Sequence, residues 1–355
     1  MPLHGIHVNA FNAEVRGTLA RGRPGLVKTL DFGPDWAALR AEHGFRFLLG
    51  RVWCDDDQDL TPTPEAAAER LWRRVWDKIA RHATTLDAVE QPWNECHQRG
   101  SDLAMHALAA RRFCELAHGE GVAVAVGCFS VGNPEPDELA ALYTPALELA
   151  DYLAVHEYWL PGVFNAPWWT GRWRRLLDAL PYGLRRPVIV SECGIDGGLE
   201  GRDASRAGWR AYPITPEEYA AELRQYTDSL DQDVLGVALF NCGDYAGGRW
   251  GAFEVARVPA VDAWLRAGPS DWQVRPRDPL PPPPIVEEPM GEYVVGPGVA
   301  ARMAAEGDTP ANHEVYLLPG PNYMSLTVGQ SGNLYLATPA SGVVVYSPKE
   351  YPDHR

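Results

Sequence analysis

The stretch PVIVSE, residues 187–192, is a short apolar run that ends in a serine and a glutamate. Seven further apolar runs occur in the first 270 residues, and longer amphipathic stretches separate most of them. This alternation is typical of parallel strands joined by helices. The eight expected strands are 4–9, 26–30, 45–52, 86–93, 122–129, 152–158, 187–192 and 234–240.

Two of the connecting stretches carry clear helix signals. Residues 64–82 have an apolar stripe at helical spacing, with Thr63 as N-cap and Pro64 at the first helical position. From Thr215 the order Thr-Pro-Glu-Glu is a capping box. The first connection, 10–25, is only weakly helical. Eight strands with helices over ~250 residues predict an α/β fold, the (β/α)8 or TIM barrel. Because the count includes a weak second strand, a doubly wound sheet is the alternative.

The carboxyl-terminal part of the chain differs in composition. Residues 276–289, PRDPLPPPPIVEEP, are half proline, which favours an extended, semi-rigid linker. Beyond them lie six of the 14 tyrosines, no tryptophan, and short β-like runs such as 333–337 and 342–346. We therefore expect three parts: a (β/α)8 domain over 1–272, a Pro-rich linker over 273–290 and a small β-rich module over 291–355.

Charge and composition exclude several classes of partner. The 47 acidic and 32 basic residues give a formal net charge of −15 at pH 7. Such a surface repels phosphate backbones and anionic lipid, so we expect neither nucleic acid nor a membrane as partner. No apolar run reaches the ~18 residues of a membrane-spanning helix.

The amino terminus and the cysteines bear on compartment and cofactors. The sequence MPLHGIHVNAF lacks the basic and apolar segments of a secretory signal. Six cysteines without a CxxC pair predict neither a disulfide framework nor a metal cluster. We expect a cytoplasmic protein without metal or cofactor. A protein released by cell lysis has the same sequence features.

Polar residues follow three of the expected strands. Reactive side chains of a (β/α)8 barrel lie at the carboxyl ends of the strands. The fourth strand ends in PWNE (92–95), the sixth in HEYW (156–159) and the seventh in SE (191–192). Glu95 and Glu192 would then share one mouth of the barrel. Glycoside hydrolysis needs such a pair, one carboxyl group protonated and the other ionised.

With these motifs the chain resembles the retaining glycoside hydrolases of clan A, which are built on the (β/α)8 barrel. In that clan the acid/base follows an Asn at the end of strand four, as Glu95 follows Asn94 here. The nucleophile ends strand seven, where Glu192 stands. His156 and Tyr158 match the strand-six His and Tyr of the clan, and the Tyr is expected to hydrogen-bond the nucleophile. The resemblance spans the expected barrel and is carried by these short motifs.

The resemblance implies a two-step reaction on an oligo- or polysaccharide. Glu192 attacks the anomeric carbon while Glu95 protonates the departing oxygen. Glu95 then deprotonates the water that releases the sugar from the enzyme. Asn94 is expected to hold the sugar 2-hydroxyl, and Arg51, at the end of strand three, to keep the nucleophile ionised.

Some positions depart from the clan. Cys96 stands where a Pro is usual, and Cys193 where an aromatic residue is common. Strand eight ends in LFNC (239–242) and lacks the Trp that forms the floor of the sugar site. The floor is therefore expected to come from elsewhere, and Trp250 in the following loop is our candidate. The other substrate-binding candidates at strand ends are Trp53, Trp159 and Asn241.

Other polar residues of the expected barrel have structural interpretations. Glu157 is one residue off the face that carries His156, because strand side chains alternate. Glu90 lies within strand four and suits a buried polar anchor. His7 and Lys28 point toward the mouth by the same alternation, although structural roles are favoured for both.

Two alternatives to the hydrolase remain open. One is a non-catalytic carbohydrate-binding or scaffolding protein that keeps the barrel without turnover. The other is a hydrolase of bacterial cell-wall glycan, encoded by a phage, with the carboxyl-terminal module as wall anchor. The tyrosines of that module suit binding of glycan or of a protein partner.

Overall fold

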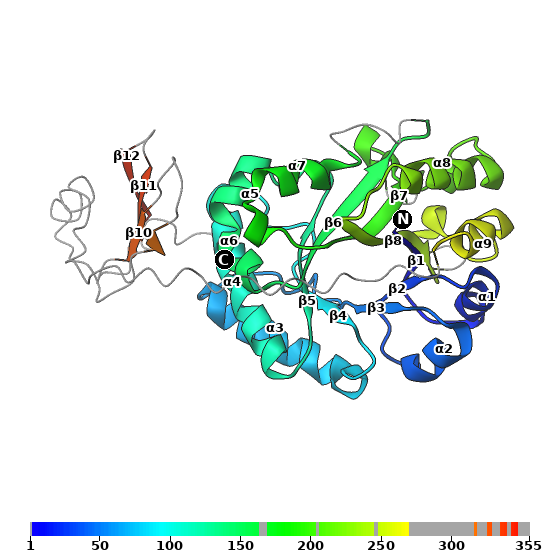
Figure 1. Ribbon diagram of the computed structural model, residues 1–355, viewed down its shortest axis with the longest axis horizontal. Helices are drawn as coiled ribbons and strands as arrows, with labels where there is room; N and C mark the ends of the chain where they lie inside the picture. Colours follow the sequence, from blue (N-terminus) through cyan, green and yellow to red (C-terminus); the bar gives the residue numbers. More distant parts are fainter. Residues whose placement is uncertain are drawn as a thin grey trace. The chain divides into compact units, whose positions relative to one another are not determined.

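The chain folds around a closed barrel of eight parallel strands that follow one another in chain order (Figure 1). The computed structural model describes residues 2–162, 169–203, 206–244 and 248–269, and the backbone of four strands between residues 316 and 346. The barrel strands are β1 (Leu3–Val8), β2 (Leu26–Thr29), β3 (Phe47–Gly50), β4 (Ala88–Glu90), β5 (Val124–Phe129), β6 (Tyr152–Trp159), β7 (Val188–Ile195) and β8 (Val234–Cys242).

The pairing of β1 with β8 closes the sheet. The predicted (β/α)8 barrel is therefore confirmed, and the doubly wound alternative is wrong, because an open sheet leaves its edge strands unpaired. All eight expected strands are present, including the weak second one, which pairs with β1 and β3 along its whole length.

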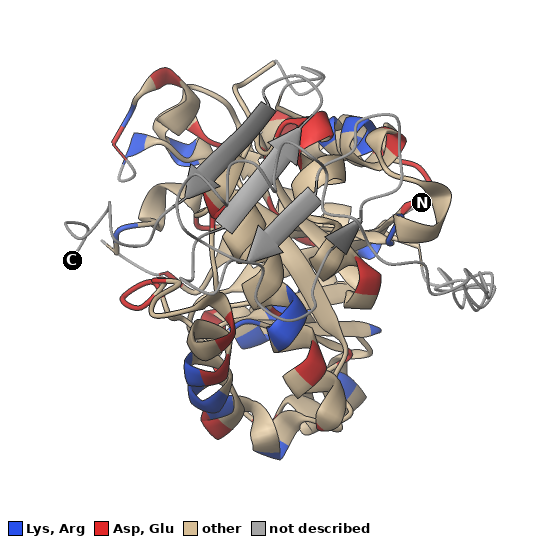
Figure 2. Ribbon diagram, turned by 90° about the vertical axis from the view of Figure 1, so that its left-hand side faces the viewer, with Lys and Arg blue, Asp and Glu red and all other residues tan. Residues whose placement is uncertain are grey.

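Helices surround the barrel on its outer side (Figure 1). They are α1 (Ala13–Gly22), α2 (Trp36–His43), α3 (Pro64–Ile79), α4 (Gly100–Gly119), α5 (Pro136–Leu142), α6 (Thr144–Leu149), α7 (Arg172–Ala179), α8 (Pro216–Asp228) and α9 (Pro259–Arg266). Short 3-10 turns lie at Ala80–His82, Tyr182–Leu184, Gly197–Glu200, Trp209–Ala211 and Gly251–Phe253. In Figure 2 acidic and basic residues are interspersed along these outer helices. An example is the ion pair of Arg112 with Glu69, 2.8 Å.

Local signals explain where several helices begin. The Thr63 side chain accepts a hydrogen bond from the Ala66 amide, and Pro64 opens α3 as predicted. Both bonds of the capping box form at the start of α8. The connection expected to be only weakly helical, residues 10–25, contains the ten-residue helix α1, so its helical content is greater than the sequence pattern indicates. The Asn12 side chain caps it by accepting from two backbone amides.

Irregular pairing is concentrated toward the carboxyl ends of β5 to β8. Between β6 and β7, Val155 pairs with Val190, but His156 pairs with Glu192, so Ser191 is an extra residue. Cys128 is likewise the extra residue of β5 and has a positive φ of 48°. Such bulges turn side chains toward new directions and are frequent beside active sites.

Four further strands form a separate antiparallel sheet in the order β12-β11-β10-β9. They are β9 (Tyr316–Leu317), β10 (Ser325–Val328), β11 (Leu334–Thr338) and β12 (Gly342–Tyr346). Contacts divide the chain into Met1–Pro276 and Arg277–Arg355. The expected linker, 273–290, lies outside the described residues, and the three-part division of the chain stays a prediction. Within the described helices, none has the length and apolarity to cross a bilayer.

Candidate active site

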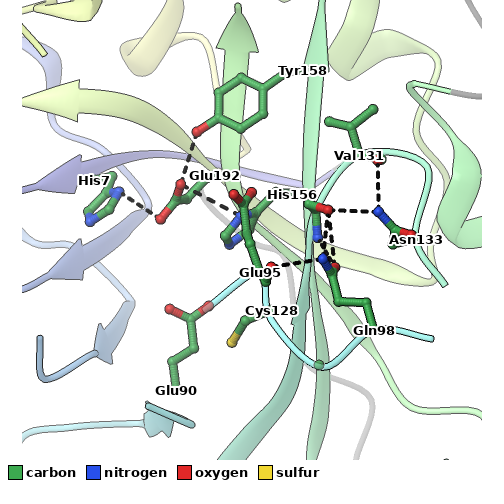
Figure 3. Close-up of polar contacts among 12 residues, drawn as sticks. His7, Glu90, Glu95, Gln98, Cys128, Val131, Asn133, His156, Tyr158 and Glu192 are labelled. Carbon is green, nitrogen blue, oxygen red and sulfur yellow. Dashed lines mark hydrogen bonds and ion pairs between the residues drawn. The ribbon is translucent and has the colours of Figure 1, made fainter. Parts of the chain in front are cut away.

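Glu192 on β7 lies at the centre of a group of polar side chains from several strands (Figure 3). Its side chain is only 8% exposed. The Tyr158 hydroxyl on β6 donates to its Oε2 atom at 2.9 Å, and the Lys28 ammonium on β2 donates to its Oε1 atom at 3.1 Å. The hydrogen bond expected from Tyr158 is therefore present, and Lys28 contacts the carboxylate directly.

Further basic groups surround the same carboxylate. The Arg51 guanidinium, just after β3, lies 3.7 Å from Oε1, and His7 Nδ1 on β1 lies 3.6 Å from it. Burial opposes the ionised form of Glu192, but electrostatic interactions with His156 and Lys28, followed by His7 and Arg51, outweigh it. They hold the pKa of Glu192 well below its ordinary range. Glu192 is thus an ionised, almost fully buried carboxylate.

Glu95 lies in the loop after β4, and its side chain is 38% exposed. Its Oε1 atom is 2.6 Å from His156 Nδ1, and the same nitrogen is 3.7 Å from Glu192 Oε2. Glu95 Oε1 and Glu192 Oε2 are therefore no more than about 6.3 Å apart, the sum of 2.6 and 3.7 Å. One buried and one exposed carboxyl group thus flank a single imidazole, as Figure 3 shows.

Beneath this pair, Lys28 also contacts a second buried carboxylate. Its Nζ atom lies 2.6 Å from Glu90 Oε2, and neither side chain has any exposed surface. Burial opposes both charges, but the pKa of Lys28 is raised by Glu192 and Glu90, and the pKa of Glu90 is lowered by Lys28 and Arg51. Glu90 is therefore more than an isolated polar anchor, because it shares the cation that contacts Glu192.

An aromatic cluster lies beside the nucleophile candidate. The Phe240 ring on β8 is 5.2 Å from the His7 ring and 6.3 Å from the Tyr158 ring, centre to centre. Trp250 packs on Phe240 edge to face at 5.3 Å. Strand eight, which lacks the Trp of the clan, therefore supplies the Phe240 ring beside the site. Trp250, the residue expected to form the floor of the sugar site, belongs to the same cluster through its contact with Phe240.

The remaining substrate-binding candidates lie in different places. Trp53 is 48% exposed, 5.8 Å from the Arg51 guanidinium. Asn241 is fully buried, and its side-chain amide has no hydrogen-bond partner among the described residues. The Asn94 Oδ1 atom is likewise buried, with no partner within the described part of the chain.

Trp159 does not join this group. It is fully buried, its ring lies 4.8 Å from the Tyr226 ring of α8 at a tilt of 32°, and its indole nitrogen donates to Glu222 at 3.0 Å. It therefore lies on the outer face of β6, and its expected contact with substrate is wrong. Its neighbour Glu157 also faces outward, where it accepts from the Tyr226 hydroxyl at 2.6 Å, in agreement with a structural role.

Sequence reasoning missed a residue near Glu95 and Glu192. Gln98, in the loop that carries Glu95, hydrogen-bonds both that loop and Ser130 after β5. No signal at the level of single residues marks it. Among the residues that the structure describes, no cluster of three or more His, Cys, Asp or Glu side chains has the arrangement of a metal site.

No family model and no curated protein matches this sequence. Several glycoside hydrolases are among the solved structures of similar fold. A family 17 β-1,3-glucanosyltransferase from Rhizomucor miehei is 15% identical, over 70% of this chain and 92% of its own, with a TM-score of 0.43. A family 39 glycoside hydrolase from Bacteroides cellulosilyticus is 12% identical, over 94% of this chain and 70% of its own, with a TM-score of 0.47.

The similar structures are not confined to glycosidases. A D-allulose 3-epimerase from a Methylomonas species is 13% identical, over 75% of this chain and 94% of its own, with a TM-score of 0.44. At such identities and TM-scores the likeness is no guide to the reaction, because one fold hosts many activities. The function has to be inferred from the side chains of the site.

Proposed function

We propose that this protein is a retaining glycoside hydrolase, with Glu192 as nucleophile and Glu95 as acid/base. The observation that carries the proposal is the pair of carboxyl groups on either side of His156, with oxygens at most about 6.3 Å apart. Retaining enzymes place the two carboxyl groups about 5–5.5 Å apart, and inverting enzymes about 6.5–9.5 Å. The bound on this one oxygen pair leaves room for the retaining spacing, and the proposal of a direct attack by Glu192 rests as well on the buried, ionised state of that carboxylate.

The surroundings suit the two carboxyl groups to different tasks. Glu192 is buried and ionised, with Lys28 at 3.1 Å and Arg51 at 3.7 Å from Oε1. A nucleophile must carry this charge before the reaction begins. Glu95 is exposed enough to meet a glycosidic oxygen and to exchange its proton with water. Two carboxyl groups in such unlike environments are the usual basis for acid and nucleophile roles.

The proposed reaction proceeds in two displacements. In the first, a Glu192 oxygen bonds to the anomeric carbon, the glycosidic C–O bond breaks, and the Glu95 proton passes to the departing oxygen. In the second, Glu95 takes a proton from water, whose oxygen attacks the anomeric carbon and releases Glu192. Asn94, next to Glu95, is the candidate for holding the sugar 2-hydroxyl. The substrate is an oligo- or polysaccharide with a β-linkage.

A mechanism-based label tests the proposal. We would incubate the protein with dinitrophenyl 2-deoxy-2-fluoro-β-glycosides of glucose, galactose, mannose and xylose, and measure its intact mass. An accepted sugar should add one fluoroglycosyl unit, which peptide mapping should place on Glu192. Glu192→Gln is the control and should stay unlabelled. Turnover of the matching substrates without any adduct would contradict double displacement.

The wild-type protein and its Glu95→Gln and Glu192→Gln variants also distinguish the hydrolase from the two alternatives. In a non-catalytic barrel, the wild-type protein would release no phenol from any glycoside, and Glu95→Gln would bind glycan as the wild type does. A cell-wall hydrolase would clear a suspension of bacterial cell walls and leave plant polysaccharides intact. We expect turnover that is lost in both Glu95→Gln and Glu192→Gln.

A further inference from the structure

The Gln98 side chain ties the loop that carries Glu95 to the loop after β5 (Figure 3). The Gln98 Nε2 atom donates to the Glu95 carbonyl at 2.9 Å and to Ser130 Oγ at 2.9 Å. Its Oε1 atom accepts from the Ser130 amide at 2.6 Å. One amide group therefore bridges the loop after β4 and the loop after β5.

The chemistry of these partners suits an amide at position 98. The Glu95 carbonyl can only accept a hydrogen bond, and the Ser130 backbone N–H can only donate one. A side chain between them needs a donor on one side and an acceptor on the other, as the glutamine amide has. A glutamate at this position would place an oxygen against the Glu95 carbonyl, and a methionine would pair with neither group.

Glu95 needs external support for its backbone. Its φ of 53° lies in the left-handed region, which a residue with a Cβ atom rarely adopts and which costs free energy. The Glu95 amide donates to the Cys128 carbonyl at 3.0 Å, and its carbonyl accepts from Gln98. The backbone amide of Glu95 is therefore held by β5, and its backbone carbonyl is held by the Gln98 side chain.

Ser130, the partner of Gln98 in the loop after β5, is itself held by further hydrogen bonds. Asn133 Nδ2 donates to Ser130 Oγ at 2.9 Å, and Arg99 Nε donates to Asn133 Oδ1 at 2.7 Å. Ser130 is thus held by two side chains besides its own strand. Movement of Gln98 relative to β5 would have to break several hydrogen bonds at once.

We propose that Gln98 is a positioning residue that holds the Glu95 backbone so that its carboxyl group meets His156 and the leaving-group oxygen. This inference rests on the proposed function, because it assigns a partner to the acid/base. Gln98 itself touches no reacting atom. A shift of about 1 Å in a catalytic group is enough to slow a reaction by roughly a hundredfold.

The test uses the dependence of rate on the leaving group. Loss of acid catalysis slows the cleavage of poor leaving groups and spares good ones, which depart without a proton. We would compare phenyl and 2,4-dinitrophenyl β-glycosides of an accepted sugar. Gln98→Met and Gln98→Glu should lower kcat/KM for the phenyl glycoside by about ten- to a hundredfold. For the dinitrophenyl glycoside, kcat/KM should stay close to the wild-type value.

Three variants complete the experiment. Gln225→Met, an exposed glutamine on α8, is the matched control and should leave both substrates unaffected. Glu95→Gln should show the same selectivity for good leaving groups in stronger form. Ser130→Ala removes one partner of Gln98 and keeps the backbone amide, so it should show a smaller loss of the same kind even if Gln98 variants fold poorly.

The outcomes separate the two proposals. An equal loss on both glycosides, or no loss on either, would overturn the role of Gln98 while the wild-type activity still stands. A wild-type protein that neither turns over a glycoside nor accepts the fluoro sugar would overturn the proposed function, and this inference with it.

Discussion

At the scale of single residues, the site depends on how a buried carboxylate keeps its charge. Burial and the Lys28 charge lower the pKa of His7 well below its ordinary value, so His7 is neutral at neutral pH. Lys28 on β2 and Arg51, just after β3, are then the cations that offset Glu192 and Glu90. Two buried cations facing two buried carboxylates form a balanced group, in which the loss of one member leaves a charge unpaired.

Tyr158→Phe removes the hydroxyl that donates to Glu192 Oε2 and keeps the ring that packs near Phe240. A hydrogen bond to a charged group contributes about 1.5–3 kcal/mol, so we expect kcat to fall about ten- to a hundredfold. Steady-state kinetics on an aryl glycoside measures this. Tyr182→Phe is the control, because Tyr182 is 87% exposed. Equal kinetics for wild type and Tyr158→Phe would show that the hydroxyl does not assist the reaction.

Lys28→Met leaves Glu90 and Glu192 without their shared cation. We expect the pKa of Glu192 to rise, so the acidic limb of kcat/KM moves to higher pH. A pH–rate profile measures the shift. Lys78→Met, an exposed change on α3, is the control and should keep the wild-type profile. An unshifted acidic limb in Lys28→Met would mean that other groups keep Glu192 ionised.

The same variant should also be less stable. Breaking a buried ion pair costs about 3–5 kcal/mol at neutral pH. In the wild type, Glu192 and Glu90 have lowered pKa values, so their stabilisation is present above about pH 4.3 and is lost as pH falls through the folded-state values. The difference in unfolding free energy should therefore shrink in acid. Urea unfolding of both proteins at several pH values measures it.

At the scale of elements, the ends of the strands do more than connect helices. The extra residue Ser191 brings Glu192 opposite His156, and the extra residue Cys128 supplies the carbonyl that binds the Glu95 amide. Helix α8 supports β6 from outside through Tyr226 and Glu222, which contact Glu157 and Trp159. The outer helices therefore hold the strands, while bulges direct side chains into the site.

Thr215→Ala removes the capping box of α8. We expect the free energy of unfolding to fall by about 1 kcal/mol, because the freed backbone amide loses its partner. Kinetic constants should not change, since the cap contacts no group of the site. Thermal unfolding and steady-state kinetics measure both quantities. Thr84→Ala, at an exposed turn, is the control and should leave stability unaffected. A large loss of activity in Thr215→Ala would connect α8 to catalysis directly.

At the scale of the whole molecule, the site exists only when the barrel is closed. Its side chains come from β1, β2, β4, β6, β7 and β8 and from the residues after β3 and β4. Lys28 and Glu192, for instance, are 164 positions apart in the chain. Every residue of the site lies within Met1–Pro276, one of the two units into which contacts divide the chain.

A chain that ends at Pro276 should therefore fold and hydrolyse small aryl glycosides with unchanged kcat/KM. Truncation removes no described contact of the barrel site. The measurement is kcat/KM and the thermal midpoint, each compared with the full chain. Loss of activity together with a retained thermal midpoint would show that residues beyond 276 take part in the site.

Much of the barrel can be predicted from local patterns. Apolar runs of strand length, the Thr63 and Thr215 caps and the polar ends of strands act over a few residues, so they are visible in the chain. The motifs around Glu95 and Glu192 could be placed at one mouth because parallel strands of a barrel share their carboxyl ends. The outward position of Trp159 follows from the same alternation, once His156 and Tyr158 face inward.

The sequence by itself determined the order of the barrel strands, and it predicted that Glu95, Glu192, His156 and Tyr158 gather at one mouth of the barrel. Only the tertiary structure decided that Lys28 joins Glu90 to Glu192, that Phe240 lies beside His7, and that Gln98 supports Glu95. The physical reason is distance along the chain. Periodicity and capping record interactions between near neighbours, whereas these contacts depend on strand register, bulges and barrel closure, which arise from the packing of the whole chain.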